Sequence, residues 1–83
     1  MSQTSQQTLA TLLKRRLDLI SDRDFRDRDS AGHLAALREV SESIDTAYLA
    51  SKSTFAPRLR HFMEQASYSK ALEYIEQEAA RGL

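Results

Sequence analysis

Apolar and small residues at positions 34–55 are spaced in alternating steps of three and four. They are Leu34, Leu37, Ser41, Ile44, Tyr48, Ser51 and Phe55. This spacing lines one face of an α-helix and suits packing against another helix. It predicts a helix over about 30–53, with Asp29 or Ser30 as the residue that caps its start.

A second apolar stripe lies nearer the N-terminus. At 100° per residue, one half of a helical wheel holds Leu9, Leu12, Leu13, Leu17, Leu19 and Ile20. The stripe predicts a helix over about 5–24, which ends within the Asp- and Arg-rich block at 22–29. Thr4 and Gln7 have the spacing of a capping box, in which each side chain bonds to a free backbone N–H. Residues 1–4 are expected to fray.

The third helical region follows Pro57, which suits the first turn of a helix but not its interior. Its apolar face changes direction after position 66. The first face holds Leu59, Phe62, Met63 and Ala66, and the second holds Tyr68, Ala71, Leu72, Ile75 and Ala79. This pattern predicts that residues 57–81 form one helix or a helical hairpin. A break with Ser67 as the cap is favoured, because a straight helix cannot bury both faces against one partner. Gly82 is expected to end the last helix.

Composition also favours helices over strands. Eleven alanines and eleven leucines, both strong helix formers, outnumber one valine and three isoleucines. We therefore predict an all-α fold, with residues 1–83 forming a single domain built as a small three- to four-helix bundle. Its two long helices are expected to run antiparallel, with the C-terminal helical hairpin packed across them.

The charges balance in number but not in position. Twelve Lys and Arg residues match twelve Asp and Glu residues, yet 1–20 and 51–64 are net positive and the other segments are net negative. This alternation favours helices that pair with each other or with a second copy of the chain. Zero net charge is not typical of nucleic-acid binders. The basic segments 14–16 and 52–61 nevertheless leave weak nucleic-acid association as the alternative function.

Several kinds of chemistry are not expected. The chain has no cysteine, so it holds no disulfide and no Cys-ligated metal. His33 and His61 are its two histidines, and neither has a metal-ligand or nucleophile partner at a suitable spacing. The acidic block at 22–29 lacks the ligand positions of a calcium loop. We therefore expect no metal, no cofactor and no enzymatic activity. No apolar run approaches the length of a membrane span and no signal peptide is evident, so we expect a cytoplasmic protein without a membrane partner.

Arg16 lies within the apolar half of the first helix. It is expected either to pair with a carboxylate such as Asp45 or to face a pocket between helices and bind an anion. Arg58 and Arg60 are further candidates for such an anion or ion-pair site.

Two short stretches resemble known families. The run Leu12-Leu13-Lys14-Arg15-Arg16-Leu17 resembles the first helix of the small all-helical chorismate mutases, which implies a third function, a helical enzyme with an Arg-lined pocket. The chain departs from that family at Arg26, where the family has lysine. Residues 55–79 resemble one tetratricopeptide-type hairpin in the spacing of Phe55, Phe62, Tyr68, Ala71 and Ile75. That resemblance implies helical-hairpin packing and no binding residues, and Leu59 and Glu78 depart from it.

Four apolar residues fall outside these stripes or at the end of the chain: Phe25, Leu49, Tyr74 and Leu83. Apolar residues that gather on a surface mark an interface. The sequence therefore predicts a non-catalytic interaction or adaptor module that uses these residues to bind itself as a homodimer or to bind another protein.

Overall fold

The computed structural model describes residues 4–81, which form five α-helices, one short 3-10 helix and no strand. The helices are α1 (Ser5–Ser21), α2 (Arg23–Arg28), α3 (Ser30–Ser51), η1 (Lys52–Thr54), α4 (Pro57–Glu64) and α5 (Tyr68–Arg81). The all-α prediction is therefore confirmed. The expectations for residues 1–3, Gly82 and Leu83 lie outside the described residues.

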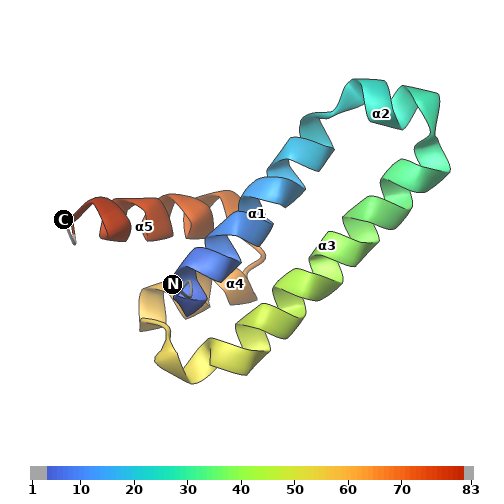
Figure 1. The fold of residues 1–83 in the computed structure, drawn as a ribbon. Coiled ribbons are helices and arrows are strands. Elements are labelled where there is room, and N and C mark those ends of the chain that lie inside the picture. Colours follow the sequence, from blue (N-terminus) through green and yellow to red (C-terminus); the bar gives the residue numbers. More distant parts are fainter. Residues whose placement is uncertain (1–3, 82–83) are drawn as a thin grey trace.

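The N-terminal half of the chain is a helical hairpin, in which α1 leads to α2 and α3 returns beside α1 (Figure 1). The capping box at the start of α1 is present, with the Thr4 hydroxyl accepting from Gln7 N–H at 3.1 Å. The helix predicted for about 5–24 ends earlier, at Ser21. There the Asp22 carboxylate accepts the Phe25 N–H at 3.0 Å and starts α2 as a separate helix.

Helix α3 begins as expected, because the Asp29 carboxylate caps it by accepting the Gly32 N–H at 2.9 Å. The predicted packing face is wrong at its first residue, since Leu34 is 59% exposed and His33 is buried instead. The reason is the hydrogen bond from His33 Nε2 to the Leu19 carbonyl at 2.6 Å, which turns His33 toward α1. Phe55 is buried too, but it lies beyond the end of α3 in extended backbone.

The C-terminal region is a helical hairpin and not one long helix. Pro57 occupies the first turn of α4, and the chain turns at Ala66, whose φ of 55° is left-handed. Few residues other than glycine adopt this conformation, and it ends the run of helical geometry. The break predicted near 66–69 is thus present. Ala79, by contrast, is exposed and does not belong to the buried stripe of α5.

The core lies toward one end of the hairpin, where α4 and α5 join it (Figure 1). Leu9 and Leu13 of α1 are fully buried there, in one cluster with buried residues of α3, α4 and α5. After Leu13 no residue of α1 is buried, and Ile20 is 45% exposed. We call residues 17–37 the outer half of the hairpin. Across this half, α1 and α3 pack together without a third helix over them (Figure 1).

Among the described residues, no helix combines the length and the apolar character that crossing a bilayer requires.

Candidate functional site

The apolar residues predicted to share an interaction surface do not come together. The Phe25 ring packs edge-on against the His33 ring, with centroids 5.5 Å apart, at the corner between α2 and α3. Tyr74 packs against Phe62 between α4 and α5, with centroids 6.3 Å apart. Leu49 stands 68% exposed on α3, and Leu83 lies outside the described residues. Phe25 and Tyr74 therefore serve packing within the chain.

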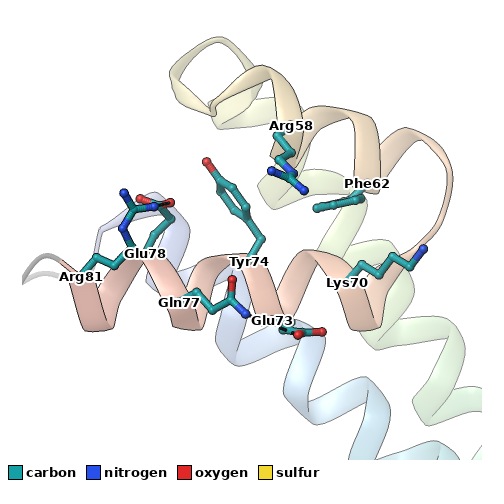
Figure 2. Close-up of a pocket in the computed structure, with 8 residues that line it drawn as sticks. All are labelled: Arg58, Phe62, Lys70, Glu73, Tyr74, Gln77, Glu78 and Arg81. Carbon is teal, nitrogen blue, oxygen red and sulfur yellow. Dashed lines mark hydrogen bonds and ion pairs between the residues drawn. The ribbon is translucent and has the colours of Figure 1, made fainter.

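A groove of about 490 Å³ lies between α4 and α5. Figure 2 shows Arg58, Phe62 and Tyr74 facing one another in it, and the Arg58 guanidinium carbon is 5.9 Å from the centre of the Phe62 ring. At the far end Arg81 pairs with Glu78 at 3.2 Å. The groove holds charges of both signs, and its central arginine already stacks on an aromatic ring of the same chain.

A polar cluster joins α3 to α4 beside the core. The Tyr48 hydroxyl donates a hydrogen bond to Glu64 Oε2 at 3.1 Å, and Lys52 Nζ lies 3.7 Å from the same oxygen. Burial raises the pKa of the Tyr48 hydroxyl, as do the hydrogen bond to Glu64 and its negative charge, whereas Arg60 lowers it. Arg60 thus lies near Tyr48, and Lys52 of the basic segment 52–61 has a carboxylate partner within the chain.

The raised pKa of Tyr48 predicts a loss of stability in alkali. The unfolded chain releases this proton near pH 10, while the folded protein keeps it to a higher pH. The stability that the protonated Tyr48 hydroxyl contributes is therefore fully present below about pH 10 and is lost as the pH rises through the folded pKa.

In urea titrations we expect the free energy of unfolding to fall more steeply above about pH 10 in the wild type than in Tyr48→Phe. Near pH 7 that variant should be less stable by about 0.5–1.5 kcal/mol, through the lost hydrogen bond. Equal alkaline slopes for the two proteins would contradict this role of Tyr48.

Arg16 reaches the side of α1 where α5 begins. Its guanidinium carbon lies 4.8 Å from the centre of the Tyr68 ring. Within residues 4–81 it forms no ion pair with Asp45 or with any other carboxylate, so the expected pair is absent. Its Nε is buried and has no hydrogen-bond partner among those residues. Burial of an unpaired donor costs free energy, which makes Arg16 an unsatisfied group in the single chain.

The three candidate arginines do not form one anion site. Arg16 lies against Tyr68, Arg58 against Phe62 and Arg60 near Tyr48. Arg16 and Arg58 therefore each lie over a different aromatic ring, and Arg60 acts on a third residue, Tyr48, through its charge.

The two histidines have separate surroundings. His33 is buried and its Nε2 donates to the Leu19 carbonyl, so it holds the end of α1 against α3. His61 is exposed beside Phe62, with ring centroids 6.0 Å apart. Over the described range, no group of three or more His, Cys, Asp or Glu side chains is arranged to hold a metal ion.

An apolar surface remains open on the outer half of the hairpin. We call it the open face and define it as Leu17, Ile20, Leu34 and Leu37. Ile20 and Leu34 are 45% and 59% exposed, Leu37 is half-buried, and Leu17 is half-buried where it packs against the edge of the core cluster. Each helix contributes two of these residues three positions apart, so the members of each pair are neighbours on their helix.

Helical geometry places the open face on the side of the hairpin that α4 and α5 cover further along. Ile20 lies one turn after Arg16, which contacts Tyr68 at the start of α5. Leu34 lies about four turns before Tyr48, whose hydroxyl bonds to Glu64 of α4. The open face therefore continues the apolar surface of the core beyond the point where α5 begins. The sequence did not reveal it, because both Ile20 and Leu34 fit the predicted buried stripes.

Comparisons with known proteins give no family for this chain, since no protein-family model, no curated protein and no solved structure matches it. The short resemblances to chorismate mutases and to a tetratricopeptide hairpin therefore have no support from a family match.

Proposed function

We propose that this chain is a non-catalytic interaction module that associates with itself through the open face of its α1–α3 hairpin. The observation that carries the proposal is the uneven core. Leu9 and Leu13 are fully buried, whereas Ile20 and Leu34 on the same bundle are about half exposed. A second hairpin laid on the outer half supplies the missing helical layer, as two hairpins do in a four-helix bundle.

The gain from covering this face is modest. Full burial of a large aliphatic side chain contributes about 1.5–3 kcal/mol, and roughly half of that remains available at Ile20 and at Leu34. Two copies bring four such side chains together, which gives roughly 4 kcal/mol. Association itself costs at least about as much, so burial of the half-buried Leu17 and Leu37 and further contacts along the outer half must supply the net affinity. The interface is therefore of the small, weak class, below about 1,200 Å². Association should be sought at high protein concentration.

The test is the effect of one charge placed in the open face. Sedimentation equilibrium on the wild-type chain, at about 10–500 μM, is expected to show a monomer–dimer equilibrium. Leu34→Glu should shift it to monomer, because a carboxylate in a closed apolar interface lacks a partner. The matched control is Leu49→Glu, the same substitution at a residue 68% exposed elsewhere on α3. It should leave the equilibrium unchanged.

Two results would contradict the proposal. A wild-type chain that is monomeric across the whole concentration range would remove self-association. Dimerisation abolished by Leu49→Glu and unaffected by Leu34→Glu would move the interface to the outer surface of α3. Circular dichroism checks that both variants keep the helical content of the wild type, as expected for substitutions at exposed positions.

A further inference from the structure

We propose that in the self-associated form Arg16 is paired by carboxylates of α2 from the second copy, Asp24 and Asp27, with the two hairpins antiparallel. This inference rests on the proposed self-association and specifies its geometry. It begins from two sets of charges that the single chain leaves unmatched. One is the guanidinium of Arg16 at the inner end of the open face, and the other is the pair of free carboxylates at the tip of the hairpin.

The unmatched cation is Arg16. Its guanidinium carbon lies 4.8 Å from the centre of the Tyr68 ring. Its Nε is buried without an acceptor, and the side chain forms no ion pair within residues 4–81. Its Nε is shielded from water, and a carboxylate brought to its terminal nitrogens adds charge-assisted hydrogen bonds. Ile20 lies one turn further along the same side of α1, so Arg16 borders the open face directly.

The unmatched anions are on α2. The carboxylates of Asp22 and Asp29 cap helices α2 and α3. Those of Asp24 and Asp27 are exposed and have no hydrogen bond or ion pair within the described part of the chain. Three residues apart, they share one flank of α2. Arg23 and Arg28 each lie one turn from one of these carboxylates, and the Arg28 Nε donates to the Asp24 backbone carbonyl oxygen at 3.3 Å. Neither arginine forms an ion pair with Asp24 or Asp27 among the described residues, so both carboxylates are available to a partner.

Symmetry brings these two sets together. A face that pairs with itself about a two-fold axis, with its helices antiparallel, sets each end of the face against the other end in the partner. Arg16 lies at the inner end of the open face, where α5 begins, and α2 lies at the outer end (Figure 1). The antiparallel arrangement therefore places α2 of each copy beside Arg16 of the other. A parallel arrangement would set α2 against α2 and leave both arginines without a carboxylate.

The test is a charge exchange between copies. Arg16→Glu sets like charges against Asp24 and Asp27 of the partner, and the double substitution Asp24→Arg with Asp27→Arg sets like charges against Arg16. Each protein alone is expected to dimerise about tenfold or more weakly than the wild type. A 1:1 mixture of the two restores opposite charges at both contacts of the heterodimer. Its dissociation constant should return to within about threefold of the wild-type value.

Matched controls change the same charges elsewhere. Lys14→Glu makes the same change of charge on α1, at an exposed position on the opposite side of the helix. Arg26→Glu makes the same change of charge on α2, on the side of that helix away from Asp24. Neither control is expected to weaken dimerisation or to be rescued by mixing. If Arg16→Glu does not fold, Arg16→Gln and Arg16→Lys replace it, and the proposal requires glutamine to weaken dimerisation while lysine preserves it.

The outcomes separate this inference from the one on which it rests. If the wild type dimerises and Leu34→Glu prevents it, but the charge exchange has no effect, self-association stands and the antiparallel pairing is wrong. If the single-charge proteins are weakened and the mixture stays weak, the charges act without direct pairing, and the inference is again overturned. A monomeric wild type overturns both proposals.

Discussion

Replacing Leu13 with alanine is expected to lower the free energy of unfolding by about 2–5 kcal/mol. The side chain is fully buried in the cluster that joins α1 to α3, α4 and α5, so its removal leaves a cavity where all these layers meet. A domain of this length has a total stability of about 4–12 kcal/mol. The loss is therefore a large part of the total, and the midpoint of thermal unfolding should fall by about 4–8 °C for each kcal/mol.

Leu49→Ala is the control for this substitution. Leu49 is 68% exposed, and its truncation should change stability by less than about 0.5 kcal/mol. Urea denaturation followed by circular dichroism measures both variants. Equal midpoints for the two would mean that Leu13 is not at the centre of the core.

The second large effect is expected from Ala71→Asp. Ala71 is fully buried on α5, in the same cluster as the leucines of α1. An aspartate there adds both volume and an unpaired charge to a close-packed site, and such changes cost about 3–5 kcal/mol. We expect α5 to leave α1, with loss of protection from hydrogen exchange throughout Tyr68–Arg81.

Ala79→Asp is the matched control on the same helix. Ala79 is exposed. Aspartate there destabilises the protein only through its weaker helix propensity and its negative charge near the helix C-terminus, which together cost about 1 kcal/mol of unfolding free energy. Hydrogen exchange of α5 should then stay close to that of the wild type. Equal destabilisation by the two substitutions would contradict the docking of this face of α5 on the core.

Local signals in the sequence predicted the helices well. The ends of the helices follow from short-range chemistry, as the capping box of Thr4 and Gln7 and the cap at Asp29 demonstrate. The break after α4 was also predictable, because the apolar face changes direction there. The left-handed conformation of Ala66, which makes the turn, was not predictable, since alanine rarely adopts it.

Burial was harder to predict, because it depends on which neighbour each face meets. Leu34 and His33 are adjacent, and the 3–4 spacing accommodates either at the start of the buried face. His33 is the buried residue of the two because the Leu19 carbonyl of α1 accepts its hydrogen bond. Leu19 lies fourteen residues from His33, so the spacing of apolar residues along the helix does not indicate this partner. The same limit hid the open face, since a stripe of apolar residues does not reveal how far its covering helix extends.

Phe25 and Tyr74 have contacts within the chain that the sequence did not indicate. Both fall outside the regular stripes, so the sequence suggested that they were free to bind a partner. Each instead packs against a ring contributed by a neighbouring helix, His33 and Phe62 respectively. Aromatic side chains are long enough to fill the corners between helices, where no periodic pattern applies.

The contact between α1 and α5 has a consequence for how the chain is made. Leu9 and Leu13 are translated some sixty residues before the part of their cluster formed by Ala71, Leu72 and Ile75. Until α5 has been made, the hairpin exposes the side of these leucines that α5 covers, a state that favours aggregation or capture by chaperones. Only when α5 has left the ribosome can it close over them.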